Sequence, residues 1–205
     1  MSADEPTRHD GGALILAAGF GRRFGSDKRA HRLPGGQTLL QATCERYAEV
    51  YERICVVLRP EDETLARRIR RLPGNPEIAL ATDARLGMGH SLAAGIRSIG
   101  EEWHWASVAL GDMPYVGAAT LRELLGVFFA EDARRIVQPT YDGTPGHPVT
   151  FPGDCFAEMC QLQGDQGARA LLKGNERLLQ HPVPDPGVLD DVDTPDAAAA
   201  TERRR

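Results

Sequence analysis

Five stretches of strand length in this 205-residue chain are continuously apolar, without the alternation of apolar and polar residues seen in half-exposed strands. They are "ALILA" (13–17), "RICVVL" (53–58), "EIALA" (77–81), "WASVAL" (105–110) and "RRIVQPT" (134–140). A strand that is apolar on both faces is buried on both faces. The chain is therefore expected to form a mostly parallel sheet that is covered on each side by helices.

Segments with helical spacing lie between these strands. In "TLLQATCERYAEVY" (38–51), apolar residues recur at i, i+4, i+7 and i+11, which predicts an amphipathic helix. Three further helices are predicted in "ETLARRIRRL" (63–72), "GHSLAAGIRSI" (89–99) and "AATLRELLGVFF" (118–129). Alternating strands and helices predict a three-layer α/β/α sandwich with a Rossmann-like sheet.

The pattern changes after residue 140. The turn-rich "YDGTPGHPVTF" (141–151) predicts a small antiparallel excursion. A helix in "GARALLKG" (167–174), a short strand near "RLLQHPV" (177–183) and a closing helix in "TPDAAAA" (194–200) are expected to follow. Residues 13–197 are predicted to form a single domain, with flexible tails at 1–12 and 198–205.

Charge and composition exclude several classes of partner. The net charge is −5, from 24 basic and 29 acidic residues, so no general attraction to nucleic acid is expected. No apolar run approaches the roughly 20 residues of a membrane span, and the polar start lacks the apolar segment of a signal peptide. The four cysteines form no C-x-x-C pair. We therefore expect a cytoplasmic protein with reduced thiols that binds neither nucleic acid nor membrane.

The first strand runs into a glycine-rich basic loop, "AAGFGRRFGSDK" (17–28). A dinucleotide-binding fingerprint would need a glycine where Phe24 stands, and a Walker A loop would need Gly-Lys-Ser/Thr where the chain has "GSDK". The loop combines backbone donors with fixed positive side chains. Such a loop suits a triphosphate that gains negative charge during a reaction better than a pyrophosphate that is only bound.

The stretch "LAAGFGRRFGSDK" resembles the L-A-A-G-x-S-x-R-M-G-x-x-K signature of MobA-like nucleotidyltransferases, and most of all the branch of molybdenum-cofactor cytidylyltransferases. Five more motifs follow in the family's order: "LGMGHSLAAGI", "GDMP", "GHPVTF", "GDQGAR" and "DVDTPDA". The resemblance implies a sheet of the nucleotide-diphospho-sugar transferase type. It also implies transfer of CMP from CTP to a phosphorylated acceptor, molybdopterin or molybdenum cofactor, with Mg²⁺ and with release of pyrophosphate.

The resemblance assigns roles around the nucleotide. Arg23 would stabilise the leaving pyrophosphate and Lys28 would approach the α-phosphate, whereas Arg22 and Arg29 are expected to be solvated flanking residues. The nucleotide-binding residues would be Leu16, Ala17, Ala18, Gly19, Gly21 and Gly25, with Gly87, Gly89 and Ser91 at a helix start.

Asp112 of "GDMP" follows a buried strand, at the edge of the sheet where open α/β folds bind ligands. An aspartate there can also form a turn or cap a helix, but the family's catalytic metal aspartate occupies this place. The resemblance implies Mg²⁺ ligation by Asp112 and by Asp193, which could also cap a helix that starts at Pro195. The acceptor pocket would be shaped by His147, Asp165, Gly167 and Arg169.

Other substrates remain open at this point. The "LAAG" sequence favours CTP, because guanylyl-transferring relatives tend to show L-A-G-G, but GTP and another small phosphorylated metabolite are alternatives. The basic "RAHRLPGG" segment is longer than in the family and leaves the acceptor open. An NAD(P)-binding oxidoreductase is disfavoured by the misplaced third glycine. A non-catalytic cofactor chaperone is disfavoured by the retained charged residues, although an apo-molybdoenzyme or chaperone could be a partner.

Overall fold

The computed structural model describes residues 6–20, 27–33 and 35–192. Its sheet has eight strands in the order β3-β2-β1-β4-β7-β5-β6, with β8 beside β5. The strands are β1 (Gly11–Leu16), β2 (Ile54–Leu58), β3 (Glu77–Leu80), β4 (Trp105–Leu110), β5 (Ile136–Tyr141), β6 (Thr144–Pro145), β7 (Val149–Pro152) and β8 (Leu178–Pro182).

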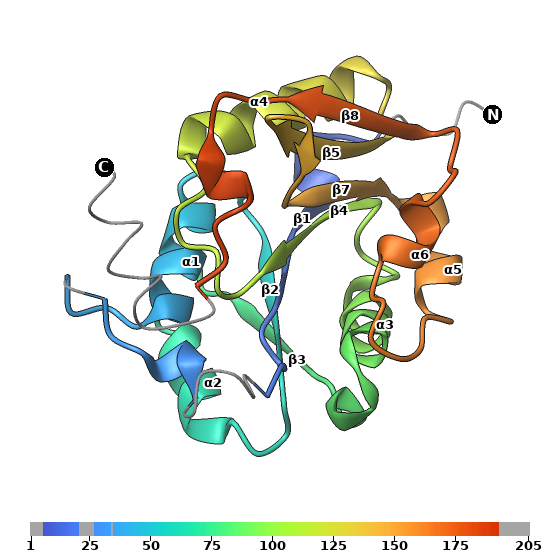
Figure 1. Cartoon of the computed structure of the whole chain (residues 1–205). Coiled ribbons are helices and arrows are strands. Elements are labelled where there is room, and N and C mark those ends of the chain that lie inside the picture. The colour runs from blue at the N-terminus through green and yellow to red at the C-terminus, as the bar shows by residue number, and fades with distance from the viewer. Residues whose placement is uncertain (1–5, 21–26, 34, 193–205) are drawn as a thin grey trace.

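Helices cover both faces of this sheet (Figure 1). The helices are α1 (Leu39–Ala48), α2 (Glu63–Ile69), α3 (Met88–Ile99), α4 (Ala118–Ala130), α5 (Phe156–Met159) and α6 (Arg169–Leu172). Helices α1, α2 and α4 pack on one face, and α3, α5 and α6 pack on the other. The predicted α/β/α sandwich is confirmed. Within the described residues, no helix is long and apolar enough to span a membrane.

The sheet has a separate apolar core on each face, and these two cores explain the continuous apolar runs in the strand sequences. On β1, Ile15 packs in the core beneath α1 and α4, whereas its neighbour Leu14 packs in the core beneath α3. Both side chains are fully buried. Successive side chains of a strand point to opposite faces, so a strand between two cores is apolar at neighbouring positions as well as at alternate ones.

Several boundaries differ from the sequence-based prediction. Strand β1 begins at Gly11 and follows a 3₁₀ turn at Arg8–Asp10, so residues 8–12 do not belong to the tail expected at 1–12. Helix α1 ends at Ala48, and Tyr51 is buried beyond its end, with its ring 5.5 Å from that of Tyr47. The helix expected at 167–174 is limited to Arg169–Leu172. The closing helix expected at 194–200 lies outside the described residues.

The expected antiparallel excursion is present. Strand β7 is inserted between β4 and β5 and is antiparallel to both, whereas β8 returns parallel to β5. On the other side of the sheet, the chain runs outward from β1 to β2 and β3, then crosses through α3 to β4, which pairs with β1. The direction of strand order thus reverses between β1 and β4, and such a reversal opens a crevice at the carboxyl ends of the two strands.

A substitution at Gly12 tests the close packing at the start of β1. A Cβ atom at Gly12 would clash with the carbonyl oxygen of Arg53 and lie 2.8 Å from the Trp103 ring. We expect Gly12→Ala to lower the free energy of unfolding by about 1–3 kcal/mol, the usual cost of overpacking a core. Gly126→Ala is the control, because no described residue lies within 4 Å of its added methyl in α4. It should raise the free energy of unfolding by about 0.5–1 kcal/mol. Urea denaturation measures both, and a Gly12→Ala protein as stable as the wild type would contradict this packing.

Candidate functional site

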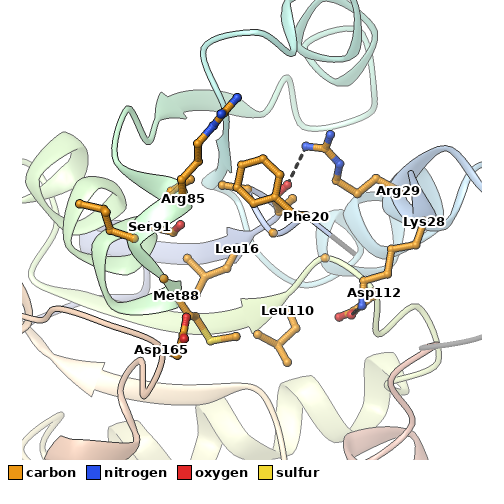
Figure 2. A pocket seen from close by; sticks show the side chains of 17 residues that line it. Leu16, Phe20, Lys28, Arg29, Arg85, Met88, Ser91, Leu110, Asp112 and Asp165 are labelled. Carbon is orange, nitrogen blue, oxygen red and sulfur yellow. Dashed lines mark hydrogen bonds and ion pairs between the residues drawn. The ribbon is translucent and has the colours of Figure 1, made fainter. Parts of the chain in front are cut away.

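A cavity of about 390 Å³ opens at the carboxyl ends of β1 and β4 (Figure 2). Its walls come from the segments that follow β1, β3 and β4, together with parts of the chain at 28–29 and at 165. The lining residues are Leu16, Ala17, Ala18, Gly19, Phe20, Lys28, Arg29, Ala84, Arg85, Leu86, Gly87, Met88, Ser91, Leu110, Gly111, Asp112 and Asp165. The cavity therefore lies at the switch point that the sheet topology creates.

Small residues after β1 form one wall. Ala17 continues the sheet by donating its N–H to the carbonyl of Val57 at 3.0 Å, and Ala17 and Ala18 are both buried. Among the described residues, nothing lies within 4 Å of the place where a Cβ of Gly19 would stand. A ligand can thus approach the backbone closely along this segment. Leu16, Ala17, Ala18 and Gly19 all line the cavity, as the expected nucleotide-binding role requires.

Two glycines at the start of α3 hold the opposite wall. Gly87 has φ +123°, a conformation that favours glycine, and a Cβ there would clash with the carbonyl group of Gly164. Gly89 donates its N–H to the Gly164 carbonyl at 2.8 Å, and a Cβ on it would lie 2.7 Å from the Gln163 carbonyl oxygen. Close docking of residues 163–165 onto α3 brings Asp165 into the cavity, beside Met88 in Figure 2.

Not every expected residue of this region reaches the cavity. Gly87, Ser91 and Asp165 line it, whereas Gly89, Gly167 and Arg169 do not. Gly167 instead packs against Met88, whose sulfur would lie 3.1 Å from a Cβ at that position. Gly89 and Gly167 therefore act on the cavity wall through backbone packing.

Lys28 and Asp112 meet across the cavity. The Lys28 ammonium pairs with the Asp112 carboxylate, and the two side chains are 19% and 15% exposed (Figure 2). Lys28 begins the 3₁₀ turn Lys28–Ala30, which is capped by the Asp27 side chain. Asp112 follows β4, and its carbonyl accepts the N–H of Val192 at 3.0 Å. Two candidate catalytic residues that are far apart in sequence are thus in direct contact.

Arg29 contradicts its expected place on a solvated flank. The residue is 4% exposed, and its guanidinium donates to Asp27, to Asp62 and to the carbonyl of Ala17. Burial acts to lower the pKa of Arg29, but hydrogen bonds to Asp27 and Asp62 outweigh it and raise that pKa, so the side chain stays charged. Asp62 comes from the turn after β2, and the sequence alone gave no signal that it would meet Arg29.

Phe20 also lines the cavity, although no role was predicted for it. Its ring lies 4.8 Å from the Arg59 guanidinium and 5.7 Å from that of Arg85. Phe20, Leu86 and Met88 are among the large apolar side chains that the fold leaves exposed. They give the cavity an apolar rim next to its charged end.

His147 lies near Asp112 but does not line the cavity. Its Nδ1 is buried without a hydrogen-bond partner among the described residues, and its backbone N–H donates to the Val188 carbonyl at 2.9 Å. Burial lowers the pKa of His147, against the opposing effects of a backbone hydrogen bond with Val108 and of the Asp112 charge. The imidazole is therefore neutral at pH 7.

Four expected site residues cannot be placed. Gly21, Arg23 and Gly25 of the basic loop and the second metal ligand Asp193 lie outside the described residues. Their roles stay predictions. In the described part of the chain, no group of three or more His, Cys, Asp or Glu side chains is arranged to hold a metal ion.

One family of known proteins matches most of the chain. The family described as "MobA-like NTP transferase domain" matches residues 13–182. The chain belongs to this family. The match spans seven strands completely, all of β1 (Gly11–Leu16) except its first two residues, and every cavity-lining residue. It confirms the family predicted from the ordered motifs. The chain is thus a nucleotidyltransferase of the MobA-like type.

Individual relatives differ in what they do. The purine catabolism protein PucB of Bacillus subtilis strain 168 is 29% identical over 195 residues, which cover 89% of this chain and 91% of PucB. The bifunctional protein GlmU of Mycobacterium sp. strain KMS is 30% identical over 154 residues, but this chain matches only 31% of its length. The crystal structure of an Rv0371c homologue from Mycobacterium sp. strain JC1 superposes with a TM-score of 0.81 at 26% identity. That alignment covers 97% of this chain and 100% of the homologue.

The buried imidazole makes stability depend on pH in a predictable direction. An unfolded histidine titrates near 6.5, whereas burial lowers the folded pKa of His147, so the unfolded chain binds more protons between the two values. The contribution of His147 to the free energy of unfolding is therefore fully present above about pH 6.5. It is lost as the pH falls towards the folded pKa. His147→Gln should remove this part of the decline. Urea denaturation of metal-free protein between pH 5 and pH 8 measures it, and an unchanged slope in the variant would refute the buried neutral state.

Proposed function

We propose that the chain transfers CMP from CTP to a small phosphorylated acceptor, molybdopterin or molybdenum cofactor. An oxygen of the acceptor phosphate attacks the α-phosphorus, the bond from that phosphorus to the α–β bridging oxygen breaks, and pyrophosphate leaves with the electron pair. Both reactants are anions, so the reaction needs neutralising charge and alignment more than an acid or a base. The observation that carries the proposal is the contact of Lys28 with Asp112 at the crevice between β1 and β4.

The nucleotide would lie along the cavity with its two ends in different surroundings. Lys28 and Asp112 lie at one end in Figure 2, whereas Ser91 and Arg85 lie towards the other, with Phe20 between them. We assign the phosphates to the charged end and the base to the end near Ser91. The open backbone at Gly19 and the small side chains of Ala17 and Ala18 suit close contact with the nucleoside. The choice of CTP rests on the "LAAG" sequence at residues 16–19.

Lys28 would act on the reacting phosphate. A lysine ammonium is a compact charge with three donors, and it can leave Asp112 for an α-phosphate on which negative charge develops. Arg23, outside the described residues, is proposed to hold the leaving pyrophosphate. A guanidinium can bind two phosphate oxygens at once, which suits a group that must be held both before and after the bond breaks.

The donor set near Asp112 fits a magnesium ion. Mg²⁺ prefers hard oxygen ligands and is usually held by one or two carboxylates, with water and phosphate oxygens as the remaining ligands. Asp112 would supply one carboxylate. Asp193 would supply the second, because Val192, the residue before it, is hydrogen-bonded to the Asp112 carbonyl. A bound Mg²⁺ would supply charge neutralisation at the phosphate oxygens.

The acceptor would enter from the side of Asp165, which lines the cavity. Gly167, packed against Met88, would shape this side, and His147 and Arg169 stay predicted acceptor residues that do not line the cavity. Met88, which is exposed and lies beside Asp165 in Figure 2, adds an apolar surface that suits an acceptor with a flat ring system as well as a phosphate. Molybdopterin, a pterin with a phosphate on its side chain, combines these two features.

A pyrophosphate-release screen of four NTPs against several phosphorylated acceptors, molybdopterin included, tests the function. We expect CTP to be turned over at least tenfold faster than GTP with the preferred acceptor. A mismatched base leaves buried hydrogen-bonding groups unpaired, at about 1–3 kcal/mol each. Equal or faster turnover of GTP would refute the specificity for cytidine. The absence of pyrophosphate with every combination would refute nucleotidyl transfer to this class of acceptor.

Variants at Asp112 and Lys28 test the roles of the central pair. Asp112→Asn should lower kcat by about 10²-fold or more, because it removes a proposed metal ligand. Lys28→Ala should also lower kcat by about 10²-fold, the scale of one transition-state donor, with a smaller change in KM. Asp142→Asn is the control: Asp142 is exposed in the turn after β5 with φ 47°, which asparagine tolerates. A Lys28→Ala defect confined to KM would make the lysine a phosphate clamp only.

A further inference from the structure

The buried guanidinium of Arg29 uses all of its hydrogen-bonding capacity. Its Nε donates to Asp27 at 2.8 Å, and its Nη2 donates to Asp27 at 2.6 Å and to Asp62 at 2.9 Å. Its Nη1 donates to the Ala17 carbonyl at 2.9 Å and to the second oxygen of Asp62. An arginine has five N–H donors, and all five are accounted for here.

These contacts join three segments that surround the cavity. Ala17 belongs to the wall after β1, Asp27 caps the turn that carries Lys28, and Asp62 belongs to the turn after β2. Figure 2 shows the bond from Arg29 to the Ala17 carbonyl, with Lys28 beside it. The guanidinium thus ties the backbone on both sides of Lys28 to the wall of the cavity.

The network also reaches the apolar rim. Asp62 accepts hydrogen bonds from the Arg59 side chain at 2.9 and 3.1 Å, and the Arg59 guanidinium lies over the Phe20 ring. The two arginines and the two aspartates balance in charge, so the network adds no net charge beside a bound triphosphate. A planar guanidinium that is fully bonded on every side has little freedom to move, unlike a solvated one.

We propose that Arg29 is a positioning residue that holds Lys28 in register with Asp112 and with the wall after β1. The inference rests on the proposed function, in which Lys28 acts on the reacting phosphate. A lysine side chain is long and flexible, so its contribution to a reaction depends on how firmly its backbone is held. A displacement of about 1 Å at a reacting group can cost about 10²-fold in rate.

Three variants separate positioning from general stability. Arg29→Met keeps an unbranched apolar stem but removes every hydrogen bond of the guanidinium, and Arg29→Lys keeps the charge but loses the planar fork. Arg53→Met is the matched control: Arg53 pairs with Glu102 at 2.5 Å and with Glu77 at 3.6 Å, near the start of β2, and does not line the cavity. Thermal unfolding and circular dichroism give the folded fraction of each protein, to which the rates are normalised.

We expect Arg29→Met to lower kcat per folded molecule at least tenfold, with a change of less than about threefold in KM for the nucleotide. Arg29→Lys should recover less than half of this loss in log units, since a single ammonium cannot reach all three partners. Arg53→Met should keep wild-type kcat. A kcat within twofold of wild type in Arg29→Met, or full recovery in Arg29→Lys, would overturn the proposal.

A second measurement follows Lys28 without any turnover. Lys28 and Lys173 are the two lysines of the chain, and Lys173 is exposed. Acetylation with a low dose of N-hydroxysuccinimide acetate under native conditions, followed by peptide mass spectrometry, gives the labelling rate of Lys28 relative to that of Lys173. We expect Arg29→Met to raise this ratio at least threefold and Arg53→Met to leave it unchanged.

The two readouts distinguish the possible failures. If the wild type turns over no NTP with any acceptor, the proposed function fails, and the labelling ratio still decides whether Arg29 holds Lys28. If the wild type is active and the ratio does not change in Arg29→Met, the positioning role is wrong while the function stands. If Arg29→Met does not fold, Asp62→Asn weakens the same network from its other end, and the same two outcomes apply to it.

Discussion

Parallel pairing of β1 with β4 brings the two halves of the site together. The strands run in register from Gly11 opposite Trp105 to Leu16 opposite Leu110, so the segments that follow them begin side by side. Gly111 extends the pairing by donating its N–H to the Leu16 carbonyl at 2.9 Å. Beyond that point the two segments diverge, and the cavity opens between them. The cavity wall, the contact of Lys28 with Asp112 and the setting of Arg29 all depend on this register.

The fold and the central pair of the site follow from local features of the sequence. Continuous apolar strands required two covered faces, and the positions of Lys28 and Asp112 after β1 and β4 placed both at one edge of the sheet. What the sequence could not predict depends on contacts between distant segments. Arg29 looks solvated in a basic loop because its partner Asp62 comes 33 residues later. The docking of Gly89 onto Gly164 is equally invisible until the chain is folded.

The Asp185 carboxylate joins the last described segment of the chain to the start of α4. Asp185 accepts hydrogen bonds from the backbone N–H of Gly117 and from the Thr120 hydroxyl, each at 2.8 Å, at the start of α4. It also accepts the N–H of Gly187 at 2.9 Å. Further along, Val192 is buried against Leu33, Leu39 and Tyr115. Chain from the far end of the sequence is therefore packed beside Asp112 by apolar contacts and by the hydrogen bond from the Val192 N–H to the Asp112 carbonyl.

The docking of residues 163–165 onto the first turn of α3 means that the two sides of the cavity share one piece of backbone. Gly87 belongs to the wall assigned to the nucleotide, and Gly164 directly precedes Asp165 on the wall assigned to the acceptor. A side chain at Gly87 or Gly89 would push these walls apart and disturb both at once. A substitution at either position therefore cannot change selectivity for the nucleotide without also affecting selectivity for the acceptor. A lineage that changes one substrate must do so with residues that project into the cavity, because the glycines beneath them are fixed by both.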